Sequence, residues 1–193
     1  MAIYDNNGTT DNKIRAVYDN NGSVDHEIKA VYDNDGTLDH LVWESREYLI
    51  ENGSPTDLSQ GFRLIKQQYE SSWEQKNGYI EMQGLNGGTK GRVDCINKNI
   101  DFSKFTTLNI DIGLEGDNPE NNYIDIGLSG KEIPDYVWIP DTNPENNITN
   151  LNMLIKSRQV KTFNISDVNK KGMLMLSMNN ATPKYQIYNI WLE

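Results

Sequence analysis

From residue 61 to the end of the chain, short apolar runs alternate with clusters of turn-forming residues. Leu108, Ile110 and Ile112 alternate with polar neighbours, as do Ile124 and Ile126, which is the two-residue period of a strand with one buried face. The pattern predicts nine strands, at residues 62–67, 79–82, 91–96, 107–114, 123–128, 151–155, 161–165, 173–178 and 186–192. Gly, Asn, Asp and Pro cluster between them, and no long stretch has a helical period. The pattern favours an all-β fold, an antiparallel two-sheet sandwich of the jelly-roll type.

The first forty residues repeat one unit every 14 residues, at Tyr4, Tyr18 and Tyr32. The fullest copies read KIRAVYDNNGSVDH and EIKAVYDNDGTLDH, and a shorter copy precedes them. An alternating run followed by Asn-Gly or Asp-Gly is typical of a hairpin, because both pairs take positive φ at low cost. Each unit is therefore predicted to form a short β-hairpin, with a strand at residues 14–18, a turn at DNNG, a short return strand and a second turn at Asp25-His26.

A hairpin repeat of this size has too few large side chains to be stable alone, since two-stranded ribbons are marginal in water. We therefore expect residues 1–44 to serve attachment or oligomerisation by burying one strand face against other chains. That face is predicted to comprise Ile14, Ala16, Tyr18, Ile28, Ala30 and Tyr32. A homotrimer is the expected assembly; a dimer, or docking on a different protein, would bury the same face.

A cluster of turn formers, Asn52-Gly53-Ser54-Pro55, marks the predicted domain boundary. Residues 45–57 are read as a linker and residues 58–193 as the sandwich domain. The stretch at residues 41–52 fits either a pair of strands or a short helix.

Charge and apolar content exclude several classes of partner. The net charge of −10 and the pI near 4.7 argue against nucleic acid, which needs a basic face. No apolar run approaches the roughly 18 residues of a membrane span. The first residues have neither a basic start nor an apolar core, so we expect synthesis in a bacterial cytoplasm without secretory export. The single cysteine, Cys95, excludes an internal disulfide and is expected in the core.

Metal binding and cofactors are not expected. Asp33, Asp35 and Asp39 resemble part of a calcium loop, but Val31 and Val42 stand where its two end carboxylates are required. His26 and His40 occupy equivalent repeat positions and could ring a symmetry axis as metal ligands, although a turn role is favoured.

Enzymatic chemistry finds little support in the sequence. The stretch GLNGGTKG lacks the Gly-Lys-Ser/Thr order of a phosphate-binding loop. A glycan hydrolase needs a pair of carboxylates, and the sequence offers candidates whose separation it does not fix. They are Glu81, Asp94, Asp125, Glu132 and Asp135. A non-enzymatic protein is the favoured interpretation.

Carbohydrate binding requires exposed aromatic rings beside hydrogen-bonding groups, and carbohydrate-binding modules often have the sandwich architecture. Trp138, with Tyr136, lies in a stretch bracketed by Pro134 and Pro140 and is the leading candidate. Trp73 is the third, and burial in the core is the competing role for each. Trp191 is expected in the core.

The YDNNG repeats, the segments KNIDFSKFTTLNIDI and KTFNISD and the ending IYNIWLE together resemble a known class of proteins. They are similar to tail- or baseplate-associated structural proteins of tailed phages, and of phage-derived tail particles, from Gram-positive and especially clostridial bacteria. The resemblance implies a virion component of the tail, baseplate, collar or fibre, which is anchored to other virion proteins through its repeats and displays the sandwich. The alternative is a receptor-binding adhesin that recognises host cell-wall carbohydrate.

Overall fold

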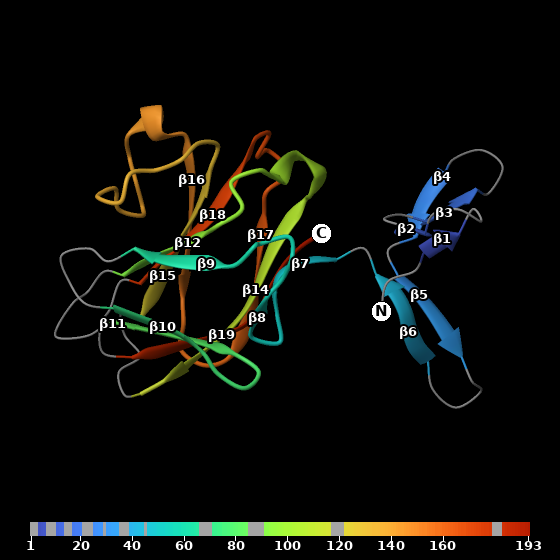
Figure 1. Ribbon diagram of the computed structural model, residues 1–193, viewed down its shortest axis with the longest axis horizontal. Helices are drawn as coiled ribbons and strands as arrows, with labels where there is room; N and C mark the ends of the chain where they lie inside the picture. The colour runs from blue at the N-terminus through green and yellow to red at the C-terminus, as the bar shows by residue number, and fades with distance from the viewer. Residues whose placement is uncertain are drawn as a thin grey trace. The chain divides into compact units, whose positions relative to one another are not determined.

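The computed structural model divides into two compact units, Met1–Arg46 and Glu47–Glu193 (Figure 1). In the first unit it describes the backbone of six strands. It also describes Arg46, the last residue of the first unit. In the second unit it describes residues 47–65, 71–84, 91–116, 122–178 and 183–193. Each unit is described by itself.

The first unit contains one antiparallel hairpin per repeat, which confirms the predicted hairpin repeats. The pairs are β1 (Tyr4–Asn6) with β2 (Asp11–Lys13), β3 (Val17–Asn20) with β4 (Asp25–Ile28), and β5 (Ala30–Asn34) with β6 (Asp39–Glu44).

The boundaries of the repeat strands differ from those predicted. Asp25-His26, predicted as a second turn, belongs to the return strand β4. The hairpin has four residue pairs, so more backbone N–H and C=O groups form hydrogen bonds than in the predicted two-residue return strand. Ile28 pairs with Val17 in one hairpin, whereas Ala30 and Tyr32 belong to the next, so the three do not share a strand. Ile14 and Ala16 lie outside the described residues.

The second unit is a jelly-roll β-sandwich of two antiparallel sheets, as predicted (Figure 1). The first sheet has the order β10 (Ser71–Gln75), β11 (Ile80–Gly84), β19 (Lys184–Leu192), β14 (Thr107–Glu115), β17 (Gln159–Asn164), and β7 (Glu47–Glu51) pairs with β19 and with β8 (Ser54–Pro55). The second has the order β16 (Ile148–Leu154), β15 (Tyr123–Ser129), β18 (Lys171–Met178), β12 (Arg92–Cys95), β9 (Phe62–Ile65), and β13 (Ile100–Asp101) pairs with β18. All nine predicted strands are present.

The helical content is small. Among the described residues it consists of two 3-10 turns, η1 (Phe102–Lys104) and η2 (Pro144–Asn146). Within the described part of the chain, no helix has the length and apolar character needed to cross a bilayer.

The segment predicted as a linker is part of the sandwich. Residues 47–51 form β7, in which Leu49 and Ile50 are fully buried and Ile50 pairs with Ile190 of β19. Asn52 and Gly53 do form a turn, but it joins β7 to β8 inside the domain. The boundary between the units therefore lies at Arg46, because burying this apolar pair in a sheet outweighs the signal of the turn formers.

The core lies between the two sheets and follows the alternation of the strands. Leu108, Ile110 and Ile112 of β14 face inward against Ile187 and Ile190 of β19. Cys95 is buried in the same core, as predicted, and burial raises the pKa of its thiol to about 12.

A buried arginine fixes the loop of residues 131–140 on the outer face of the second sheet. Arg92 is 0% exposed, and its Nε and Nη2 donate to the two carboxylate oxygens of Asp94 at 2.8 and 2.9 Å. Its remaining bonds go to loop carbonyls: Nη1 to Pro134 and Val137 at 2.9 and 2.6 Å, and Nη2 to Ile133 at 3.2 Å. Burial raises the pKa of Asp94, and the bonds from Arg92 oppose that rise.

The same loop has an apolar anchor. Ile133 and Ile139 pack on Met173 and Met175 of β18 in a small core separate from the main one. The loop is thus held by both a buried ion pair and apolar contacts.

We predict that Arg92→Met destabilises the second unit strongly, because it leaves the Asp94 carboxylate buried without its partner. The expected loss is about 3–5 kcal/mol in the free energy of unfolding, measured by urea denaturation of the full chain. The control is Arg63→Ala, which removes a half-exposed partner of Asp94 at 3.7 Å and should cost less than about 1 kcal/mol. Equal losses in the two variants would contradict this role of Arg92.

Candidate functional site

A bulge in β19 turns extra side chains onto the outer face of the first sheet. Asp111 of β14 pairs with Asn189, but the next residue, Ile112, pairs with Ile187, so Tyr188 is an additional residue. Ile187 and Ile190 stay in the core, and both Tyr188 and Asn189 point outward. Bulges of this kind occur next to functional sites because they redirect side chains without breaking a sheet.

Four aromatic residues lie on this outer face, in two pairs. Tyr79 and Tyr188 have ring centroids 5.6 Å apart, and Tyr48 and Trp191 have centroids 6.0 Å apart. The two pairs are separated by roughly 10 Å along β19, given a strand rise of about 3.3 Å per residue. We call this surface, with Asp111, Arg158, Gln186 and Asn189, the tyrosine face.

Trp191 differs in part from its predicted position. It is buried, at 9% exposure, but it does not join the main core. Its backbone partners are Asn109 of β14 and Tyr48 of β7. Its ring lies on the outer side of the sheet, where it packs against the ring of Tyr48. The three tyrosines themselves are half-buried.

A polar network flanks the ring of Tyr188 on both sides. The Asp111 carboxylate accepts from Arg158 Nε and Nη2 at 3.1 and 2.8 Å and from Asn189 Nδ2 at 3.3 Å. Gln186 Oε1 accepts from the Tyr188 hydroxyl at 2.9 Å. These bonds orient the groups before any ligand arrives, which lowers the entropy cost of binding.

Arg158 stacks on the ring of Tyr188, with its guanidinium carbon 3.5 Å from the ring centroid. The hydrogen bonds to Asp111 raise the pKa of Arg158. Gly113 makes room for this stack, since a Cβ there would lie 3.3 Å from the Tyr188 ring and 3.5 Å from Arg158 Cβ. The arrangement combines a flat aromatic surface with a planar cation.

The β7–β8 turn fixes the bulged part of β19 from the other side. Asn52 N donates to Asn189 Oδ1 at 2.9 Å, and Gly53 N donates to the Tyr188 carbonyl at 2.8 Å. Gly53 has φ +71, and a Cβ at this position would meet the backbone of Tyr79 at 2.2 Å. Glycine is therefore required at position 53, because any side chain there would collide with the backbone of Tyr79, a residue of the tyrosine face.

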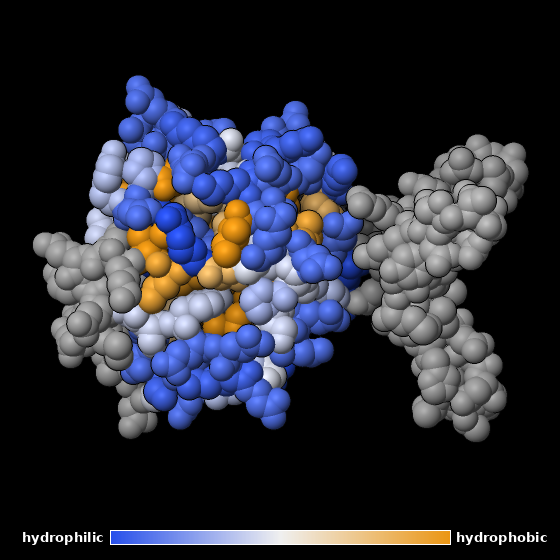
Figure 2. Space-filling model, viewed as in Figure 1, coloured by the Kyte–Doolittle hydropathy of each residue, from blue (hydrophilic) through white to orange (hydrophobic). Residues whose placement is uncertain are grey.

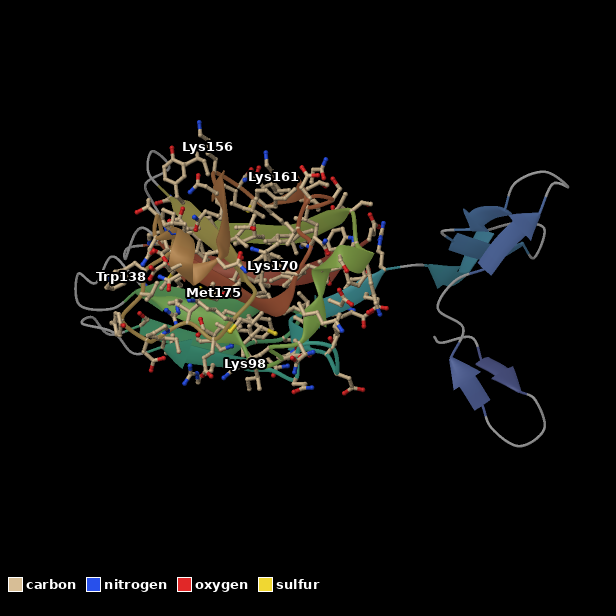
Figure 3. The ribbon with its side chains drawn as sticks, turned by 90° about the horizontal axis from the view of Figure 1, so that it is seen from above. Lys98, Trp138, Lys156, Lys161, Lys170 and Met175 are labelled. Carbon is tan, nitrogen blue, oxygen red and sulfur yellow. The ribbon has the colours of Figure 1, made fainter. Side chains whose placement is uncertain are left out.

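The predicted sugar-binding residues lie elsewhere. Tyr136 is 78% exposed in the 131–140 loop, and Trp138 in the same loop is half-buried at one end of the domain (Figure 3). Trp73 lies on β10 and faces inward, where it packs on the core and on Phe62 with centroids 5.3 Å apart. The loop thus presents an exposed tyrosine, whereas Trp73 closes the edge between the sheets.

Each of the five candidate carboxylates has a hydrogen-bond or ion-pair partner, and Asp94, Glu132 and Asp135 lie close together around Arg63. Glu81 lies on the first sheet, 3.4 Å from Lys184, whereas the other four belong to the second sheet or its loop. Their partners include Arg92 for Asp94 at 2.8 Å, Asn152 for Asp125 at 2.6 Å, Lys98 for Glu132 at 2.6 Å and Arg63 for Asp135 at 3.2 Å. In the part of the chain that the structure describes, no group of three His, Cys, Asp or Glu residues is placed to hold a metal ion.

A hollow of about 270 Å³ lies beside β9 and β12. Its lining residues are Arg63, Asp94, Cys95, Ile96, Lys98, Glu132 and Met173. The face that carries β9 is mainly hydrophilic, with an interrupted band of hydrophobic residues across its middle (Figure 2). The charged rim of the hollow is neutralised by the ion pairs described above.

No protein-family model and no curated protein matches the sequence. Among solved structures, CBM29_1, a family 29 carbohydrate binding module from Piromyces equi, is 13% identical with a TM-score of 0.49, over 76% of this chain and 89% of that one. A family 11 carbohydrate-binding module from Clostridium thermocellum, solved with a β-1,3-1,4-mixed-linked tetrasaccharide, is 14% identical with a TM-score of 0.46, over 68% and 86%. An exo-β-agarase is 10% identical with a TM-score of 0.49, over 76% of this chain but 24% of its own. No ligand or activity transfers to this chain at such low identity.

The residues of the tyrosine face were not among those predicted from the sequence. A local signal exists in QIYNIW, where Ile187 and Ile190 are three residues apart and interrupt the two-residue alternation. Such a break within a strand indicates a bulge. Tyr48, Tyr79 and Arg158 come from distant segments, and only the pairing of β7, β11 and β17 into one sheet brings them close.

We predict that Gly113→Val displaces the Tyr188 ring and loosens its stack with Arg158. The added side chain would enter the space that the ring occupies, while valine suits a strand backbone. In NMR spectra, the ring-current shift of the Arg158 side-chain protons should shrink markedly, with the free energy of unfolding changed by less than about 1 kcal/mol. Unchanged Arg158 shifts would show that the ring is not held against Gly113.

Proposed function

We propose that the second unit binds carbohydrate without catalysis, through the tyrosine face. The observation that carries this proposal is the bulge at Tyr188, which places aromatic rings and oriented polar groups together on one open side of the first sheet. The site and not the fold supports this function, because many activities share this fold.

The chemistry of the face suits a sugar chain. Sugar rings present apolar C–H faces and polar edges, and they stack on aromatic rings while their hydroxyls bond to carboxylates, amides and guanidinium groups. Asp111, Asn189 and Gln186 supply acceptors and donors beside Tyr188. The spacing of the two aromatic pairs allows a linear chain to contact both.

The proposed context is a phage tail or a phage-derived tail particle, with other virion proteins as partners. Its support is the sequence resemblance of the repeats and of the C-terminal segments. In that context the repeats anchor the protein and the sandwich is displayed to the host surface. The form of the first unit is compatible with anchoring, since each of its three two-stranded sheets has strand edges that another chain can extend.

We predict that Tyr188→Ala weakens binding of the full chain to host cell-wall polysaccharide at least tenfold. Loss of one stacked ring in a site of this size corresponds to roughly 1.4 kcal/mol or more. Binding is measured by co-sedimentation with purified cell walls and by calorimetry with soluble fragments. Tyr136→Ala is the matched control, because it removes an exposed tyrosine from the 131–140 loop.

The two variants separate the competing sites. If Tyr136→Ala abolishes binding and Tyr188→Ala does not, the site lies on the loop predicted from the sequence, and the tyrosine face is excluded. Absence of binding by the unaltered chain to walls of susceptible cells would favour a purely structural role.

For the first unit, we predict a homotrimer that depends on the repeats. The full chain should have three times the protomer mass in light scattering, whereas a truncated chain of residues 47–193 should be monomeric. The physical reason is that two-stranded sheets this short are marginal alone and gain stability by association. A monomeric full chain whose first 46 residues resist proteolysis would overturn this prediction.

A further inference from the structure

One edge of the first sheet, opposite the edge formed by β10, is cationic. The edge strand is β17, and three positive residues, Lys156, Arg158 and Lys161, fall within six positions at its start. All three are exposed, and Val160 between them is 56% exposed. Arg158 joins this edge to the tyrosine face, because it stacks on Tyr188. Lys161 pairs with the inward-facing Ile110, so its side chain leaves β17 on the other face of the sheet and reaches solvent at the edge.

The positive charges of Lys156 and Lys161 are not balanced by a carboxylate among the described residues. Neither Lys156 nor Lys161 forms an ion pair with a residue that the structure describes, and the Lys161 ammonium lies 6.0 Å from the Phe163 ring centroid. Both project from the same side of the domain, whereas Lys98 lies on the opposite side, paired with Glu132 (Figure 3). In a chain with a net charge of −10, this edge is a local exception.

Arg158 has further capacity for a ligand. Its side chain is 57% exposed, and Asp111 engages its Nε and Nη2. The guanidinium group carries five N–H donors, so Nη1 and one Nη2 hydrogen are open to an acceptor on the solvent side. The planar fork suits the paired oxygens of a carboxylate or phosphate.

We propose that the glycan bound by the tyrosine face is anionic, with its phosphodiester or carboxylate substituents lying along the edge that carries Lys156, Arg158 and Lys161. This proposal rests on the carbohydrate-binding function proposed above. An acidic protein repels an anionic polymer on average, but charges are screened beyond about 8–10 Å at physiological salt, so the local cations decide the contact. Asp111 compensates only one of the three positive charges.

The test compares Lys156→Gln/Lys161→Gln with Lys98→Gln/Lys131→Gln in the full chain. Both double variants lose two positive charges, but Lys98 and Lys131 lie away from the first sheet. The probes are a glycerol-phosphate teichoic acid, polygalacturonate and a neutral glucan. We expect Lys156→Gln/Lys161→Gln to weaken binding of an anionic probe about tenfold at low salt, with little difference at about 1 M salt. The control pair should bind as the unaltered chain does.

The outcomes distinguish this proposal from the one on which it rests. Preference for teichoic acid over polygalacturonate, or the reverse, identifies the anionic group. Neutral glucan bound at least as tightly as both anionic polymers, with loss on Tyr188→Ala, would overturn the anionic ligand and keep the tyrosine face. If both double variants lose the same affinity for the anionic probe, the effect comes from the net charge of the chain and not from this edge, which would also overturn the proposal. Binding of an anionic polymer that is insensitive to Tyr188→Ala would instead contradict the tyrosine face.

Discussion

The second unit depends on the pairing of one strand, β19, with β14 along one edge and with β11 and β7 along the other. The inward-facing side chains of β19 must fill the core while its backbone keeps its hydrogen bonds to the neighbouring strands. The bulge reconciles these demands, because Ile187 and Ile190 both face inward although three positions separate them. The same bulge therefore completes the core on the inner side of β19 and places Tyr188 and Asn189 on its outer side.

Two arginine–aspartate pairs of similar geometry have different physical roles. Arg92 and Asp94 are buried, so breaking the pair would leave a charge in a site without water, at a cost of about 3–5 kcal/mol. Arg158 is 57% exposed although its partner Asp111 is buried, so this pair is open to solvent on the side of the arginine. The first pair fixes a loop, whereas the second leaves part of the Arg158 guanidinium group accessible to a ligand.

The two outer faces of the sandwich are used differently. On the second sheet, the 131–140 loop covers Met173 and Met175 with its own isoleucines and is closed by bonds to Arg92. On the first sheet, Tyr48, Tyr79 and Tyr188 remain half-exposed above a polar network. The 131–140 loop also exposes Tyr136, but the first sheet combines several aromatic rings with a network of oriented polar groups, which makes it the better candidate for recognition. Its cationic edge adjoins that surface through Arg158 and is the basis for the proposed anionic ligand.

Local periodicity was sufficient to predict the nine main strands, the hairpin repeats and the all-β sandwich, because alternation and turn residues act over a few positions. It also predicted burial of Cys95, which lies in a regular strand. It did not predict β7, since the turn formers after it suggested a linker and only the gain from burying Leu49 and Ile50 against β19 decides otherwise. The same limit applies to the site: Trp138 and Trp73 were chosen by residue type, but the position of a ring depends on which face of which sheet it occupies. Tyr79, Tyr188 and Arg158 are far apart in sequence, and strand order and one bulge, which are set by tertiary packing, place them together.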